Sequence, residues 1–204
     1  MLFVIIHFGC WYEYVKMLKK ISPKKYGYYL PMGLLYITLP ILMMLTLGLY
    51  NPDRIRYYDF SSMWENSSQV RYSFIIPCGI IFSIWINDTM AYMVGSFIGK
   101  TPFSKISPKK TWEGTAGGAV LCIIIISWLG WILKYFTLVD WICISSICAV
   151  FGTLGDLLES KLKRKAGVKD SGTLMPGHGG FLDRFDSFLI ATPAVWLYIV
   201  SFMA

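Results

Sequence analysis

The sequence predicts an all-α fold, a polytopic transmembrane helical bundle, and three observations support this fold class. Only 15% of the 204 residues are charged and 55% are hydrophobic, whereas soluble domains carry about 25% charged residues. The mean hydropathy is +0.54. The apolar residues also gather in runs long enough to cross a bilayer. Together these observations exclude a soluble enzyme, a disordered tail and a disulfide-stapled secreted domain.

We expect about six membrane segments within one integral membrane domain. In chain order they are Met1–Leu18, Tyr28–Tyr50, Tyr72–Gly99, Gly114–Leu138, Trp141–Leu158 and Phe188–Ala204. The first is the weakest, because its apolar part ends near Val15 and covers about 22 Å against a hydrocarbon core of about 30 Å. We therefore expect an N-terminally truncated chain, in which residues 1–84 show only generic membrane helices.

The basic residues alternate between loops as the positive-inside rule requires. The loops after the first, third and fifth segments hold 15 of the 19 Lys and Arg residues. This alternation predicts six crossings, with both termini outside and the loops after the third and fifth segments on the cytoplasmic side. Membrane topology and anionic lipid headgroups therefore account for the net charge of +7, and we expect no nucleic-acid partner.

The strongest candidate site lies between Gly152 and Asp186. Four polar residues share one helix face at positions i, i+3, i+4 and i+7: Asp156, Glu159, Ser160 and Lys163. A basic cluster and the turn Met175–Gly180 follow, and the next helix opens with Asp183 and Asp186 at i and i+3. Carboxylates beside a glycine loop and several cations are what a site for Mg²⁺ and a polyphosphate requires.

A plainer interpretation is a solvated loop whose lysines only set the topology. It applies most readily to Lys161, Lys165 and Lys169. It applies less well to the aspartates, since carboxylates at the ends of apolar helices are costly unless they are paired or metal-bound.

A second cluster runs from Asn87 to Gly114. Asp88 lies inside an apolar run, and an ionisable residue there is a functional candidate. The spacing Gly95-x-x-x-Gly99 is more typical of helix packing. The same stretch resembles a P-loop but lacks its first glycine and the preceding strand, so we reject that interpretation.

The run Ser160–Ser187, SKLKRKAGVKDSGTLMPGHGGFLDRFDS, resembles the signature of phosphatidate cytidylyltransferases, the CDP-diacylglycerol synthases. The stretches Asp88–Gly95 and Ser107–Gly114 look like a second block of that family. The resemblance implies a multi-pass enzyme of the bacterial inner membrane, with its active site facing the cytoplasm. Such an enzyme converts CTP and phosphatidic acid to CDP-diacylglycerol and pyrophosphate, with Mg²⁺ as cofactor and a second cation left open. The motifs that carry the resemblance lie in residues 85–204, so it implies that these residues form the catalytic region. The resemblance also implies a homodimer.

The resemblance assigns roles to individual positions of this chain. The catalytic candidates are Asp156, Lys163, Arg164, His178, Asp183 and Asp186, of which the three aspartates are the candidate metal ligands. The substrate-binding candidates are Asp88, Ser107, Lys109, Thr111, Glu113, Lys169, Gly177, Gly179, Gly180 and Arg184. For Glu113 alone, a position that complements a helix dipole is the plainer alternative.

Two other functions remain as alternatives. A related enzyme that uses CTP on another lipid, such as a polyprenol kinase, would need the same polyphosphate chemistry. A transporter would explain Asp88 and Asp156 as ion-path residues, but it leaves the run from Pro176 to Asp186 without a role.

Overall fold

The computed structural model describes residues 2–49, 73–104, 106–172 and 179–203, and this part of the chain is helical. The longer helices are α1 (Leu2–Ile21), α3 (Leu39–Leu49), α5 (Ile75–Ile98), α6 (Trp112–Leu133), α7 (Leu138–Lys165) and α8 (Leu182–Tyr198). Short 3-10, α and π turns join or extend them: η1 (Tyr26–Tyr29), α2 (Leu30–Gly33), η2 (Leu34–Thr38) and η4 (Ile199–Met203). The predicted all-α membrane fold is therefore confirmed.

The described residues contain five helical segments that are long and apolar enough to cross a membrane. They are Tyr26–Leu49, Ile75–Ile98, Trp112–Leu133, Leu138–Lys165 and Leu182–Met203. Helix α1 is not among them, because it carries Glu13 and three lysines in its second half. The predicted orientation of the termini and the division at residue 84 stay predictions.

Two helices extend beyond their predicted membrane runs, and both extensions carry candidate site residues. Helix α7 continues from Leu158, the predicted end, to Lys165. Helix α8 begins at Leu182, one turn and a half before the predicted Phe188. Polar residues that hydropathy places in a loop are therefore held on rigid helices.

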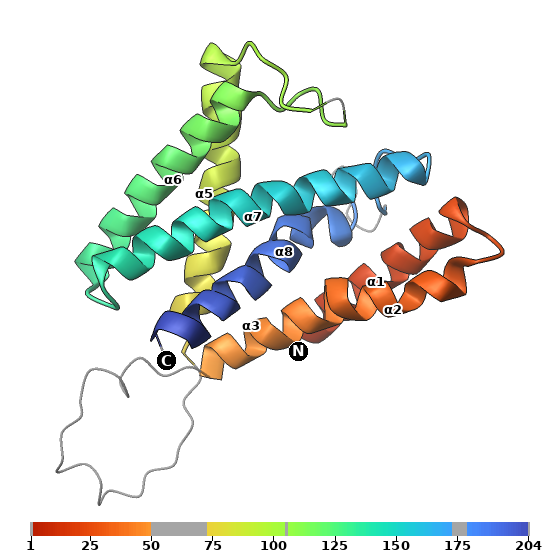
Figure 1. Cartoon of the computed structure of the whole chain (residues 1–204), viewed down its shortest axis with the longest axis horizontal. Helices are drawn as coiled ribbons and strands as arrows, with labels where there is room; N and C mark the ends of the chain where they lie inside the picture. The colour runs from red at the N-terminus through yellow and green to blue at the C-terminus, as the bar shows by residue number, and fades with distance from the viewer. Residues whose placement is uncertain (1, 50–72, 105, 173–178, 204) are drawn as a thin grey trace, which may run out of the picture.

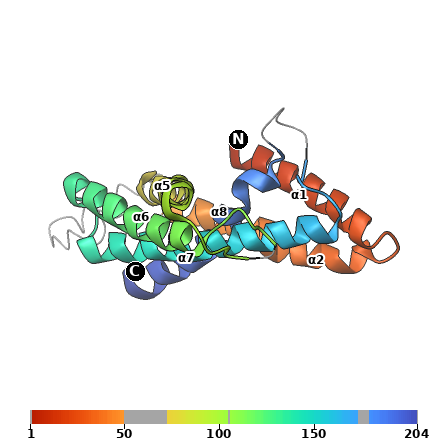
Figure 2. The ribbon, with the colours of Figure 1, turned by 90° about the horizontal axis from the view of Figure 1, so that it is seen from above.

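The helices form two groups that α7 connects (Figure 1). Helices α5 and α6 make one antiparallel pair, and α1, the α2–α3 segment and α8 pack together in the other. Seen from above, α5 and α6 lie at one end and α1 and α2 at the other, with α7 running between them (Figure 2). The main core lies among α1, α3, α7 and α8, with Met17, Ile37, Met44, Ile144, Leu182 and Leu189 almost fully buried.

The α5–α6 pair packs through small residues. A Cβ atom on Gly118 would lie 2.6 Å from the backbone nitrogen of Ala91, and one on Gly114 would lie 2.8 Å from the Cα of Gly95. Small residues at such spacing let two membrane helices approach at backbone distance. The packing role predicted for Gly95 is confirmed. The close approach also fixes the end of α5 and the start of α6, which residues 99–111 connect.

We expect Gly118→Ala to destabilise this helix pair. The added methyl group overlaps the backbone of Ala91, and overpacking of this kind costs about 1–3 kcal/mol. The melting temperature of the detergent-solubilised protein should fall by several degrees. Gly27→Ala is the matched control, since a Cβ at Gly27 meets nothing within 4 Å; equal melting temperatures for the two variants would contradict the packing.

Candidate active site

Three carboxylates meet where α7 passes the start of α8. Asp156, Glu159 and Asp186 each offer an oxygen atom, and these atoms lie within 4.8 Å of one another. Glu159 is fully buried and Asp186 is 8% exposed, whereas Asp156 is partly exposed. The helices come this close because a Cβ on Gly155 would lie only 2.5 Å from the carbonyl oxygen of Asp186. We call Asp156, Glu159 and Asp186 the carboxylate group.

Lys163 is the cation that borders this group. Its ammonium lies 2.5 Å from Glu159 Oε2 and donates a hydrogen bond of 2.6 Å to Asp183 Oδ1. The contact with Glu159 is an ion pair without hydrogen-bond geometry, and both Glu159 oxygens are buried with no hydrogen-bond partner among the described residues. Glu159 Oε2 is thus engaged by the Lys163 ammonium, whereas Oε1 has no partner among the described residues and can accept a further ligand, which would offset the cost of burying this carboxylate.

Asp183 is held by hydrogen bonds from two chain segments, one at Ser171 and one at Gly180. Its Oδ2 accepts hydrogen bonds from the backbone nitrogen of Ser171 at 2.9 Å, from the Ser171 hydroxyl at 2.9 Å and from the backbone nitrogen of Gly180 at 2.8 Å. Gly179 has a φ of +80°, a conformation that favours glycine. The Gly180 N–H therefore points to Asp183, and its predicted contact with phosphate stays a prediction.

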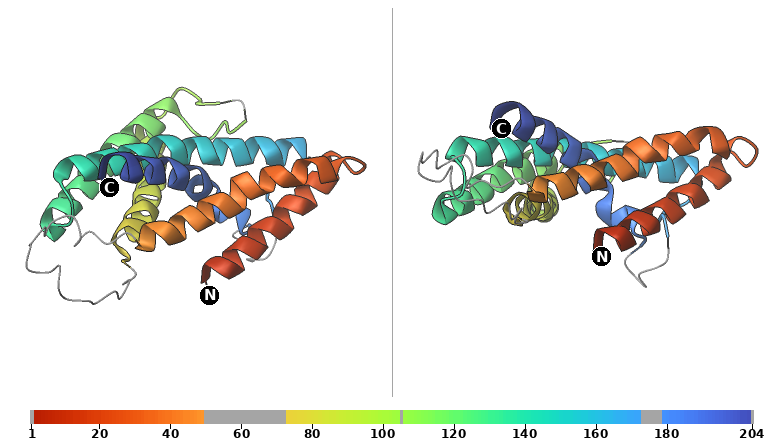
Figure 3. Two further views of the ribbon diagram at one scale, coloured as in Figure 1. Left: turned by 60° about the horizontal axis from the view of Figure 1, so that its bottom comes forward. Right: turned by 90° about the horizontal axis from the view of Figure 1, so that it is seen from below.

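Glu13 of α1 also reaches this region. Its side chain is 3% exposed, and its carboxylate contacts Ser171 and the start of α8. The right-hand view of Figure 3 shows the first turn of α8 beside α1. Sequence reasoning missed Glu13 because α1 carries no motif; the only signal was a single acid within an apolar run.

The second cluster lines a cavity of about 460 Å³ beside the carboxylate group. Helix α5 contributes Asn87, Asp88, Ala91, Tyr92, Gly95 and Ser96; the loop and α6 contribute Ser107, Lys109, Lys110, Thr111 and Thr115; α7 contributes Thr153 and Asp156. The Lys110 ammonium pairs with Asp156 across this space. Asn87 Oδ1 is buried and has no hydrogen-bond partner among the described residues. Neither Lys110 nor Asn87 was among the predicted site residues.

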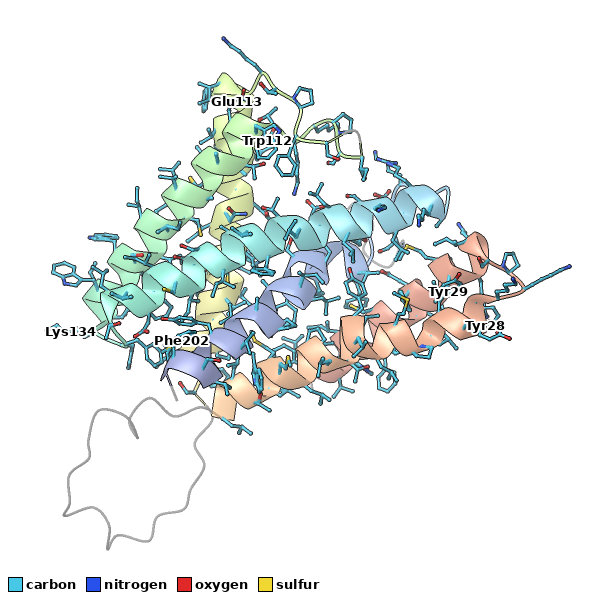
Figure 4. All side chains as sticks on the ribbon, viewed as in Figure 1. Tyr28, Tyr29, Trp112, Glu113, Lys134 and Phe202 are labelled. Atoms are coloured by element: carbon cyan, nitrogen blue, oxygen red, sulfur yellow. The ribbon has the colours of Figure 1, made fainter. Side chains whose placement is uncertain are left out.

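The loop of residues 99–111 is tied down at its base. Figure 4 labels Glu113 and Trp112 at the start of α6, where this loop ends. Glu113 accepts hydrogen bonds from the backbone nitrogens of Lys100 and Thr101 and, at 2.8 Å, from the Thr101 hydroxyl. Thr111 caps α6 by accepting a 3.1 Å hydrogen bond from Gly114 N. Glu113 is not among the cavity-lining residues, so its role in substrate binding stays a prediction.

The structure thus brings most of the predicted residues into two adjoining regions, the carboxylate group with its neighbours and the cavity. Arg164, Lys169 and Arg184 are exposed near them, and their phosphate contacts stay predictions. Gly177 and His178 lie outside the described residues. Asp156 belongs both to the carboxylate group and to the cavity lining, so it joins the two clusters.

The donor set of the carboxylate group suits a hard divalent cation. Three carboxylates supply the oxygen ligands that Mg²⁺ prefers, and Glu159 Oε1 has no hydrogen-bond partner among the described residues, while Oε2 pairs with Lys163. Asp183, predicted as a ligand, is turned toward Lys163, Ser171 and Gly180. The acidic residues therefore form a group that could hold a metal, and the identity of its ligands stays a prediction.

Comparison with known proteins gives consistent results. The relatives include three proteins named phosphatidate cytidylyltransferase. That of Staphylococcus saprophyticus is 38% identical over 147 residues, 71% of this chain and 54% of the relative. That of Synechocystis is 36% identical over 185 residues, 86% of this chain and 59% of the relative. A chloroplastic form from Arabidopsis thaliana is 47% identical over 116 residues, 55% of this chain and 29% of the relative.

The chain thus spans about half the length of the curated bacterial relatives that it matches. The model of the Cytidylyltransferase family matches residues 49–202 of this chain. These residues contain the cavity and the carboxylate group. This match covers well over half of the chain and includes α5 to α8. The chain therefore belongs to the cytidylyltransferase family.

Proposed function

We propose that this chain carries the catalytic region of a phosphatidate cytidylyltransferase. It would transfer the cytidylyl group of CTP to phosphatidic acid and release pyrophosphate. The membrane would be the bacterial cytoplasmic membrane, with the site facing the cytoplasm, as the basic loops favour. Relatives that bear this name and the membership of the family support the proposal. The homodimer implied by the resemblance stays a prediction.

One observation carries the proposal: the cavity and the carboxylate group meet at Asp156. The cavity has Lys109 and Lys110 on its wall, and lysine binds phosphate as a point charge. Its volume of about 460 Å³ falls within the range of small-molecule sites. A triphosphate can therefore lie with its anionic part between these lysines and the carboxylate group.

The reaction needs positioning and charge neutralisation more than a strong base. An oxygen of the phosphatidate phosphate forms the new bond to the α-phosphorus of CTP, and the bond from that phosphorus to the β-phosphate bridging oxygen breaks. The attacking phosphate is largely ionised at neutral pH, so no proton has to be removed first. The protein contributes by holding both phosphates in line and by stabilising the charge of the leaving pyrophosphate.

Each group of residues has a part in this scheme. Lys109 and Lys110 bind and orient the triphosphate, and Asp88 lines the same cavity. Asp156, Glu159 and Asp186 would hold Mg²⁺, and Asp183 lies beside Asp186 at the start of α8. The bound metal supplies Lewis-acid neutralisation of phosphate charge. Lys163 pairs with both Glu159 and Asp183 and so offsets the repulsion between these neighbouring carboxylates.

We expect Asp186→Asn to abolish formation of CDP-lipid while the protein still inserts in the membrane. The substitution keeps the shape of a buried side chain but removes the negative charge that a divalent cation needs. Labelled CTP, phosphatidic acid and Mg²⁺ are supplied to membranes, and lipid product and pyrophosphate are measured. Asp140→Asn, at the other end of α7, is the control; equal product from the Asp186 variant and wild type would contradict the assignment.

The Mg²⁺ requirement should change when Glu159 is replaced. Glu159→Gln removes a buried negative charge from the carboxylate group, so the half-saturating Mg²⁺ concentration should rise by about ten- to a hundred-fold. Mg²⁺ titrations at saturating CTP measure this value. Glu113→Gln, which alters an acid outside that group, should leave the Mg²⁺ midpoint unchanged. A midpoint shifted equally in both variants would argue against Glu159 as a ligand.

Lys110 should contribute to the affinity for CTP. Lys110→Ala removes a cation from the cavity wall, and we expect the KM for CTP to rise by about ten-fold, as for a charged hydrogen bond. Lys100→Ala in the same loop is the control, because Lys100 is not among the cavity-lining residues. The assignment fails if both variants change the KM equally.

A further inference from the structure

We propose that Glu13 is a positioning residue, which fixes the first turn of α8 in the geometry that the active-site carboxylates require. This inference rests on the proposed function. It concerns a helix outside the region that matches the family, since α1 ends at Ile21 and the match begins at residue 49.

The Glu13 carboxylate supplies the cap that α8 lacks. Helix α8 begins after Phe181, whose side chain makes no capping hydrogen bond. Glu13 Oε1 accepts a 3.0 Å hydrogen bond from the backbone nitrogen of Phe181, and Oε2 accepts one of 2.9 Å from that of Leu182. The first N–H groups of a helix have no partner within it, and a negative charge there is stabilised by the helix dipole.

Two glycines, Gly172 and Gly180, lie against this carboxylate. A Cβ atom on Gly172 would overlap Glu13 Oε1, and one on Gly180 would overlap Oε2. A Cβ on Gly9, one turn earlier in α1, would overlap the ring of Phe181. These glycines leave the room that the Glu13 carboxylate and the Phe181 ring occupy, so a larger residue at Gly172 or Gly180 would displace the Glu13 carboxylate from its present position.

A chain of hydrogen bonds that ends in one ion pair connects Glu13 with the carboxylate group. The Ser171 hydroxyl lies 2.7 Å from Glu13 Oε2 and 2.9 Å from Asp183 Oδ2. Asp183 in turn accepts from Lys163, which pairs with Glu159. Asp183 and Asp186 both stand on the first turns of α8, so a shift of that helix start moves both side chains.

A purely structural role and a positioning role predict different kinetics. If Glu13 only stabilises the fold, its loss lowers the amount of folded protein and leaves the turnover of the folded fraction unchanged. If Glu13 positions α8, the folded enzyme itself turns over more slowly, because small displacements of catalytic groups cost up to about a hundred-fold in rate. The KM for CTP should change little, since the lysines of the cavity belong to another loop.

The test compares Glu13→Gln with Met17→Ala in the full chain. Met17 is 1% exposed and lies on α1, one turn after Glu13, so its truncation weakens the packing of α1 in the core while it leaves the hydrogen-bonding groups of Glu13 in place. For Glu13→Gln we expect kcat per folded molecule to fall by about ten- to a hundred-fold, with the KM for CTP within about two-fold of wild type. Met17→Ala should lower the melting temperature and keep kcat per folded molecule.

Hydrogen exchange provides a readout that does not depend on activity. In Glu13→Gln the amides of Phe181 to Phe185 should exchange faster than in wild type, whereas those near Val195 should not. Faster exchange there supports the inference even if wild type makes no CDP-lipid, an outcome that would overturn the proposed function alone. Unchanged exchange at the start of α8, or a kcat loss no larger than that of Met17→Ala, would overturn the role of Glu13.

Discussion

The structure depends on how it accommodates carboxylates that are buried within and at the ends of its helices. Glu13, Glu159 and Asp186 are at most 8% exposed, and the cost of such burial is large unless each charge has a partner. The chain offsets the cost of burying these three carboxylates in three different ways. Glu13 faces backbone N–H groups at the start of α8, Glu159 pairs with Lys163, and Asp186 stands with Asp156 and Glu159 in a group suited to a cation. Because these partners lie on α1, α7 and α8, the three helices must meet at one place, and that place fixes the site.

Hydropathy alone was sufficient to predict the fold class and most of the helices. Long apolar runs interrupted by lysines leave little alternative to membrane helices, and five of the six expected segments have the length and composition to span. Hydropathy could not predict at which residues α7 ends and α8 begins, near the site. Helix α7 extends through Asp156, Glu159 and Lys163, and α8 starts at Leu182, because the polar side chains there are paired within the protein. Glu13 is likewise paired within the protein, which explains why α1 forms a helix although its hydropathy pattern indicates a membrane segment only weakly.

The candidate site was predictable to the extent that its residues follow one another in sequence. Helical spacing placed Asp156, Glu159 and Lys163 on one face, and all three do meet at the start of α8. Spacing could not distinguish Glu159 from Asp183 as the third member of the carboxylate group, since that choice depends on how α7 packs against α8 at Gly155. Helical spacing cannot predict contacts between residues that are far apart in the sequence. The hydrogen bond between Glu13 and Ser171 joins residues 158 positions apart, and no local pattern encodes it.

The Ser171 hydroxyl shows why the two ends of this network must be considered together. A serine hydroxyl has one proton to donate, yet Ser171 Oγ lies within hydrogen-bond distance of both Glu13 and Asp183. Donation to Glu13 leaves Asp183 with the backbone N–H groups of Ser171 and Gly180 and with Lys163. Donation to Asp183 strengthens the hold on that carboxylate and leaves Glu13 to the start of α8. Either arrangement leaves both Glu13 and Asp183 with hydrogen-bond donors, so the hydroxyl can change partner without leaving either of these two carboxylates unsatisfied. The other contacts of Glu13 and Asp183 hold each carboxylate in place whichever of the two receives the hydroxyl proton.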